Sequence, residues 1–104
     1  MKIQWKRTVR TNTSERFLGL DNGVEVAAAD IHYLSNGQVA GTMILLEHAA
    51  PNGEWNNAAI LDVLRSLDDG YLPDVDVDAG NLNYTVVVAK VLGNYQGASD
   101  ATRA

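Results

Sequence analysis

The sequence contains no cysteine, so disulfide bonds, thiolate zinc sites and cysteine nucleophiles are excluded. Its uninterrupted apolar runs reach only four residues, as in 86–89. A membrane-spanning helix needs about 20 apolar residues and a secretory signal at least about 7, so we expect no membrane partner. A chain of this composition suits a reducing compartment, and we predict a cytoplasmic protein.

Positive charge is scarce after residue 16. Residues 1–16 hold five of the eight lysines and arginines and a single carboxylate, whereas the rest of the chain holds three cations and twelve carboxylates, for a net charge of −5. Such an acidic chain binds phosphate backbones poorly. Aromatic residues make up only 7%, too few for base-stacking platforms. We therefore expect no nucleic-acid partner, and we interpret the N-terminal cations as a solvated strand face.

The motifs of common catalytic and cofactor sites are also missing. The nine glycines are scattered and form neither GxGxxG nor GxxxxGK. The serines lack the strand-to-helix context of a nucleophile elbow. Two histidines without cysteine cannot build a histidine-rich metal site. The sequence therefore favours a non-catalytic protein, with no catalytic residue, cofactor or resident metal predicted.

Two Asn-Gly pairs, Asn22-Gly23 and Asn36-Gly37, stand between β-rich segments. Asn-Gly accepts positive φ at both central positions of a two-residue hairpin turn. Residues 2–10 alternate between apolar and polar types, as a half-buried strand does, with Trp5 and Val9 on the same face. We expect antiparallel strands over 2–10, 15–20, 24–34 and 38–47.

The second turn implies a register for its hairpin. If Asn36 and Gly37 form a two-residue loop, Tyr33 lies opposite Ala40. One face of the hairpin then carries small and large apolar residues suited to a covering helix. The other face carries four larger apolar residues, which are Leu34, Val39, Met43 and Leu45. A slip of one residue would exchange these faces.

Residues 54–69 have the pattern of an amphipathic helix. Apolar side chains recur at 60, 63, 64 and 67, Asn52 is a candidate N-cap, and Gly70 suits a left-handed stop. Residues 82–92 are apolar on both alternating faces, which favours an interior strand. The fold class is therefore α+β: an antiparallel five-stranded sheet with one helix packed on one face, in the order β-β-β-β-α-β. Residues 1–96 form one domain, and 97–104 a flexible tail.

Three groups of residues are candidates for chemistry or binding. Asp74, Asp76 and Asp78 resemble the start of a calcium loop, but the positions for its glycine and closing glutamate hold Ala79 and Thr85. Asp30 and His32 project from one strand face, where a carboxylate could orient an imidazole. Trp55 lies off the helix stripe and is either a helix-entry contact or a binding anchor.

These patterns lead to two hypotheses of function. The first is a protein–protein interaction domain that forms a homodimer through its uncovered sheet face, with Leu34, Val39, Met43, Leu45 and Trp55 as interface residues. The second is a small-molecule or divalent-metal binding domain that uses the acidic segment 68–78.

Overall fold

The computed structural model describes residues 1–72, 75 and 80–97 of the 104-residue chain. It contains five strands and one α-helix, with two 3₁₀ turns between the fourth strand and the helix. The elements are β1 (Gln4–Arg10), β2 (Ser14–Asp21), β3 (Val24–Tyr33), β4 (Val39–Leu46), η1 (Glu47–Ala49), η2 (Pro51–Gly53), α1 (Asn57–Tyr71) and β5 (Leu82–Ala89).

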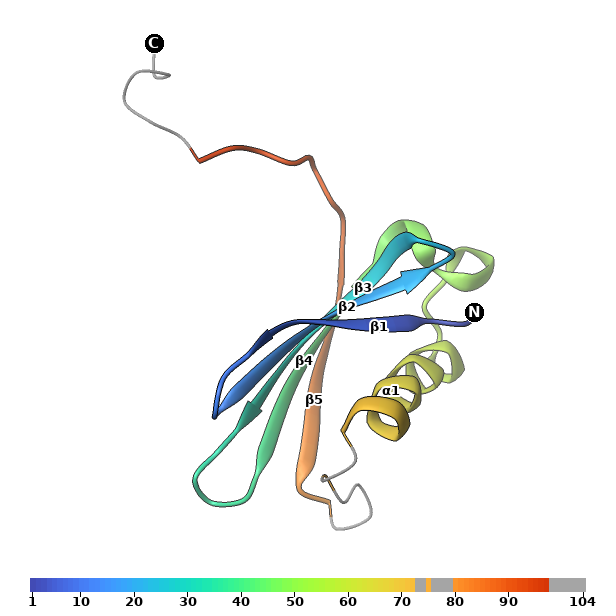
Figure 1. The fold of residues 1–104 in the computed structure, drawn as a ribbon. Coiled ribbons are helices and arrows are strands. Elements are labelled where there is room, and N and C mark those ends of the chain that lie inside the picture. Colours follow the sequence, from blue (N-terminus) through green and yellow to red (C-terminus); the bar gives the residue numbers. More distant parts are fainter. Residues whose placement is uncertain (73–74, 76–79, 98–104) are drawn as a thin grey trace.

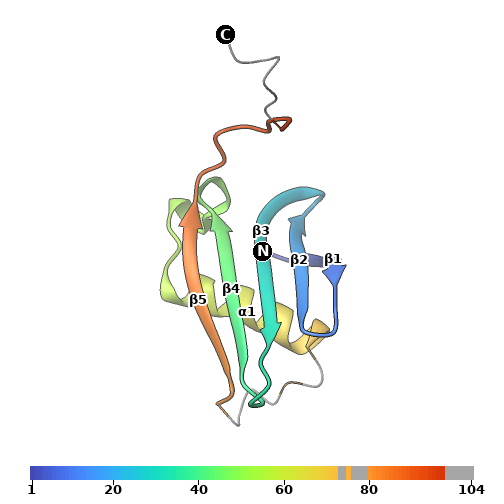
Figure 2. The same ribbon diagram turned by 90° about the vertical axis from the view of Figure 1, so that its left-hand side faces the viewer.

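All five strands form one sheet in the order β1-β2-β3-β4-β5 (Figure 2). The first four pair antiparallel, whereas β4 and β5 pair parallel. The expected α+β class with five strands and one helix is confirmed, but the expected purely antiparallel sheet is wrong. The reason is that α1 crosses back over the sheet between β4 and β5, so β5 starts again at the end where β4 starts.

The two Asn-Gly pairs form different turns. Asn22 and Gly23 have φ of 51° and 80°, and Asp21 lies opposite Val24, so this loop has two residues as expected. In the second hairpin Gly37 has positive φ (82°), and its N–H donates to the Leu34 carbonyl at 3.2 Å. The Leu34 N–H donates to the Gln38 carbonyl at 2.9 Å. This loop therefore has three residues, as in a type I turn followed by a left-handed glycine.

The additional loop residue shifts the register of β4 by one. Tyr33 lies opposite Val39, so the expected pairing of Tyr33 with Ala40 is wrong. Because strand side chains alternate, the shift turns Met43 and Leu45 toward α1, where both are 0% exposed.

The alternation in β1 is interrupted by an irregularity between Arg7 and Val9. Trp5 and Arg7 lie opposite Gly19 and Phe17, but beyond this point Val9 lies opposite Arg16. Val9 is consequently exposed, and its expected place beside Trp5 on the covered face is wrong.

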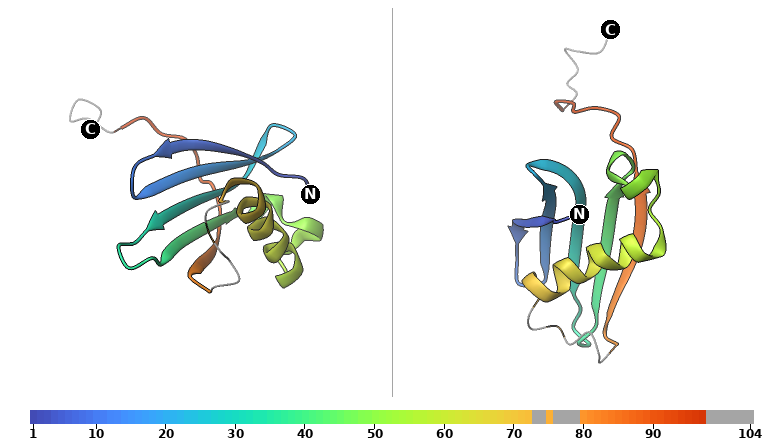
Figure 3. Two further views of the ribbon diagram at one scale, coloured as in Figure 1. Left: turned by 60° about the horizontal axis from the view of Figure 1, so that its bottom comes forward. Right: turned by 90° about the vertical axis from the view of Figure 1, so that its right-hand side faces the viewer.

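Helix α1 covers one face of the sheet (Figure 3). It begins after Asn56, whose side chain accepts the Ala59 N–H at 2.9 Å, so Asn56 is the N-cap rather than the expected Asn52. Gly70 lies inside the helix with an ordinary φ, not at a left-handed stop. Val63 and Leu67 of the expected stripe are buried against the sheet. The core cluster comprises Trp5, Phe17, Val26, Ala27, Ala29, Ile31, Val39, Met43, Leu45, Val63, Leu67 and Leu72.

Among the strands of the described residues, the last one lies at an edge of the sheet, not in its interior. Its sole strand neighbour among the described residues is β4, and Val87 and Val88 are both exposed. The expectation of an interior strand is wrong, as is its expected end at Leu92, because β5 ends at Ala89. Residues 90–97, here named the C-terminal arm, leave the sheet as a segment without helix or strand (Figure 1).

Candidate functional site

The expected interface residues do not form one surface patch. Val39, Met43 and Leu45 are core residues beneath α1, and placing them on the uncovered face is wrong because of the register shift. Leu34 is exposed in the hairpin loop. Trp55 is half-buried, and its indole N–H donates to the Leu46 carbonyl at 2.9 Å, so it packs at the helix entry.

Trp55 also lines a cavity of about 210 Å³ between the start of β1 and the first turns of α1. Ile3, Val63 and Ser66 form part of its wall. The indole N–H of Trp5 donates to Ser66 Oγ at 2.9 Å, and this hydroxyl donates to the Val63 carbonyl at 2.6 Å. The Ser66 hydroxyl at this wall thus helps to join β1 to α1.

Asp30 and His32 share the uncovered face of the sheet, as expected from their spacing. The Asp30 carboxylate accepts from Arg16 Nε at 2.7 Å and from Arg16 Nη2 at 3.5 Å. The partner of the Asp30 carboxylate is therefore Arg16 and not His32, and His32 is exposed. Asp30 and His32 are near one another, but Asp30 forms a cross-strand ion pair with Arg16 instead of orienting the His32 imidazole.

The acidic segment 68–78 is described only in part. Asp74, Asp76 and Asp78 lie outside the described residues. Asp68 Oδ1 accepts a hydrogen bond from the Tyr84 hydroxyl at 2.6 Å. Among the described residues, no group of three or more histidine, cysteine, aspartate or glutamate side chains could hold a metal ion.

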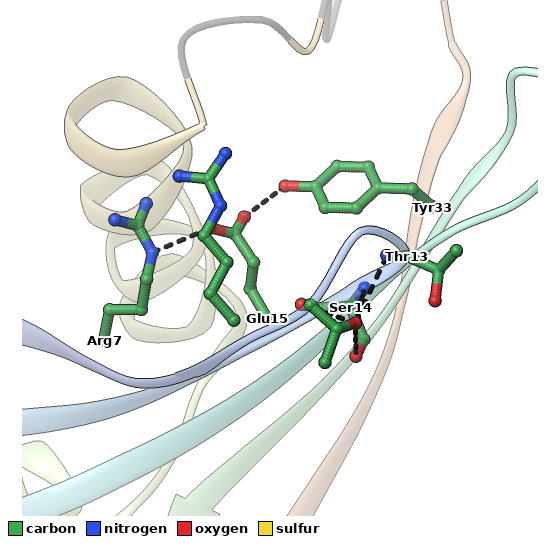
Figure 4. A network of polar contacts seen from close by, with 7 residues as sticks. Arg7, Thr13, Ser14, Glu15 and Tyr33 are labelled. Carbon is green, nitrogen blue, oxygen red and sulfur yellow. Dashed lines mark hydrogen bonds and ion pairs between the residues drawn. The ribbon is translucent and has the colours of Figure 1, made fainter.

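A buried carboxylate cluster was missed by the sequence analysis (Figure 4). Glu15 is 5% exposed and lies near the C-terminal end of α1, with Oε1 2.7 Å from Arg7 Nε and 3.8 Å from Arg10 Nε. The Tyr33 hydroxyl donates to Oε2 of the same carboxylate. Glu15 and Phe17 are two residues apart in β2, so their side chains project from the same face of the strand. A charged residue on the same face as a core aromatic residue is the sequence signal that could have revealed this cluster.

The cluster joins three adjacent strands through one anion. Desolvation raises the pKa of the Tyr33 phenol to about 12, with further contributions from its hydrogen bond to Glu15 and from the charge of that carboxylate. Arg7 also lies over the Phe17 ring, 5.3 Å from its centroid. The buried Glu15 carboxylate thus has an opposite charge at Oε1 and a hydroxyl donor at Oε2, as a buried ion requires.

The β5 edge and the C-terminal arm expose apolar side chains instead. Ten large apolar side chains of the described residues are exposed, and five of them fall within 87–95. Leu92 and Tyr95 are 84% and 86% exposed. In the described part of the chain, no backbone hydrogen bond ties residues 92–97 to the sheet or the helix. The five side chains are Val87, Val88, Val91, Leu92 and Tyr95.

On the uncovered face of the sheet, a row of apolar side chains leads to this edge. The register aligns Leu18, Ala28, Ile44 and Val87 across four strands. Leu18, Ala28 and Ile44 are each half-buried. The neighbouring row contains the Arg16–Asp30 ion pair, which interrupts the apolar surface.

No family model, curated protein or solved structure matches the chain in the three comparisons. None of the helices among the described residues has the length and hydropathy needed to cross a membrane.

Proposed function

We propose that this chain is a non-catalytic interaction domain that associates with a second copy of itself. The observation that carries the proposal is the concentration of exposed apolar side chains at one sheet edge and its C-terminal continuation. Exposed apolar side chains gathered in one region of a protein commonly mark an interface. The cytoplasmic location expected from the composition stays a prediction.

The polar contacts support a binding role over a catalytic one. Glu15 is held by Arg7 and Tyr33, Asp30 by Arg16, and the Asp68 carboxylate accepts from Tyr84. Each pair joins neighbouring strands, or the helix to a strand, and each carboxylate has its partner from within the fold. A structural use of these groups explains their positions without a substrate.

The second hypothesis, binding of a small molecule or divalent cation by segment 68–78, has less support. In the described part of this segment, Asp68 is hydrogen-bonded to Tyr84 and Asp69 is exposed. A cation site here predicts that millimolar calcium raises the melting temperature more than sodium chloride does at matched ionic strength. Equal melting temperatures would remove the divalent-cation part of this hypothesis.

Sedimentation equilibrium over a range from low to high micromolar concentration tests self-association. We expect an apparent mass that rises with concentration to twice the 11.2 kDa of the chain. A chain that stays monomeric at high micromolar concentration would contradict the proposed function.

A further inference from the structure

The outer edge of β5 offers backbone groups to a further strand. An edge strand presents a row of N–H and C=O groups that no neighbouring strand satisfies. Soluble proteins shield such edges with charged residues, prolines, bulges or short strands. The eight residues of β5 contain neither a charge nor a proline, so the strand's own sequence does not shield this edge against strand addition.

The C-terminal arm has the length and composition to cover that edge. It contains eight residues, as β5 does, and contains one charge, at Lys90. Its Leu92 and Tyr95 side chains are exposed, and the arm runs away from the sheet in both views of Figure 3. Because the arm follows β5 directly, it cannot fold back onto the outer edge of its own β5 without a turn. A second copy can accept it without one.

We infer that two copies pair their 82–97 segments antiparallel, so that the arm of each copy adds a strand to β5 of the other. This inference rests on the proposed self-association and names its surface. A two-fold axis that relates adjacent antiparallel strands is perpendicular to the sheet. The two five-stranded sheets therefore join into one continuous sheet, in which the two arms lie between the copies. Both copies of α1 cover the same face of this sheet.

The side chains favour a centre of pairing at Ala89. In this register residues 90–96 of one copy lie opposite residues 88–82 of the other, so the whole of β5 is covered. Val91 then lies opposite Val87, and Leu92 opposite Val86, which places apolar side chains in cross-strand contact. A centre one residue later would place the two copies of Lys90 directly opposite each other, and like charges in such pairs are destabilising.

A substitution in the arm tests the inference without disturbing the monomer. Leu92 is 84% exposed, so Leu92→Asp removes no core contact of the isolated chain. We expect the dimer dissociation constant from sedimentation equilibrium to rise at least tenfold. Leu34→Asp is the matched control, because it places the same charge on an exposed leucine in the β3–β4 loop. It should leave the dissociation constant unchanged.

Single cysteines test the register, because the natural chain contains none. At the two-fold centre, opposed Cβ atoms lie about 4.5–5.5 Å apart, close to the separation that a disulfide closes. Ala89→Cys should therefore form a cross-linked dimer under mild oxidation. Thr85→Cys, which is exposed on the same strand, would lie eight residues out of alignment with its copy, about 27 Å away. It should stay uncross-linked.

The outcomes separate this inference from the proposed function. A wild-type chain that never dimerises contradicts both. A wild-type dimer that Leu92→Asp leaves intact overturns the arm pairing while self-association stands. Cross-linking through Thr85→Cys as fast as through Ala89→Cys overturns it as well. Loss of the dimer in Leu92→Asp together with selective cross-linking at residue 89 supports it.

Discussion

The Tyr84 hydroxyl donates a 2.6 Å hydrogen bond to Asp68 Oδ1, which joins β5 to the last turns of α1. Burial raises the pKa of the Asp68 carboxyl above its usual value of 3.8; the hydrogen bond from Tyr84 lowers it in part, and the charge of Asp69 raises it further. The contact between α1 and β5 thus keeps the Asp68 carboxylate partly desolvated.

Asp68→Asn should relieve this cost at neutral pH. With its pKa raised in the folded state, Asp68 stabilises the fold below about pH 3.8 and loses this contribution as the pH rises through the folded pKa. The asparagine side chain would keep an oxygen for Tyr84 and would not ionise. We therefore expect the variant to be more stable relative to wild type at pH 7 than at pH 3.5, with stability measured as the free energy of unfolding.

Urea unfolding at both pH values measures this difference. Asp62→Asn is the control, because the Asp62 side chain is 81% exposed and loses little solvation on folding. Its effect on the unfolding free energy should be small, as for other exposed positions. An Asp68→Asn effect that does not change between pH 3.5 and 7 would contradict the expectation.

Gly41→Ala should destabilise the fold through the ring of Tyr84. A Cβ atom at residue 41 would lie 2.5 Å from Tyr84 Cδ1 and 3.2 Å from Ile31 Cδ1. The ring would have to move, and with it the hydrogen bond to Asp68. We expect a loss of about 1–3 kcal/mol in unfolding free energy, as for other overpacked cores, measured by urea unfolding.

Gly70→Ala is the matched control for that prediction. Gly70 lies in α1 with an ordinary φ, and an added Cβ would have no atom within 4 Å. Alanine has the higher helix propensity, so this variant should be more stable by up to about 1 kcal/mol. A stabilising Gly41→Ala variant would show that the Tyr84 ring is not packed against this glycine.

The hairpin turns show how far the sequence determined the fold. Asn22-Gly23 and Asn36-Gly37 have the same residue types, yet the first forms a two-residue loop and the second a three-residue loop. Asn-Gly occurs in both loops because glycine supplies the left-handed position in each. In β4 both parities contain large apolar residues, so hydrophobic patterning could not choose the register.

The strand order shows a different limit. The apolar pattern of residues 82–92 correctly predicted a strand, but the same pattern could belong to an interior strand or to an edge that a partner covers. Sequence periodicity reports the side chains that avoid water and does not identify the chain that covers them. The helix stripe was predictable because its apolar residues fall on one side.

Leu67→Ala tests that stripe. Leu67 is fully buried, and its truncation should cost about 2–5 kcal/mol in unfolding free energy. Leu61→Ala, on the exposed flank of the same helix, should cost less than about 1 kcal/mol. Urea unfolding measures both. Equal losses at the two positions would contradict the orientation of α1.

Tyr33→Phe tests the buried carboxylate cluster. The substitution keeps the ring but removes the hydroxyl that donates to Glu15, a residue only 5% exposed. A buried acceptor that loses its donor costs about 1–3 kcal/mol. We expect a loss of this size at pH 7, measured by urea unfolding. Tyr95→Phe, at an 86% exposed tyrosine of the C-terminal arm, is the control and should leave the unfolding free energy unchanged.

The stability difference between wild type and Tyr33→Phe should also depend on pH. Because the pKa of Tyr33 is raised from 10 to about 12 in the folded state, its protonated form stabilises the fold fully below pH 10. This contribution is lost as the pH rises through about 12. The stability difference between wild type and Tyr33→Phe should therefore shrink between pH 10 and 12, because phenylalanine does not ionise. A difference that stays constant to pH 12 would mean that burial and the Glu15 contact do not raise the pKa of this phenol.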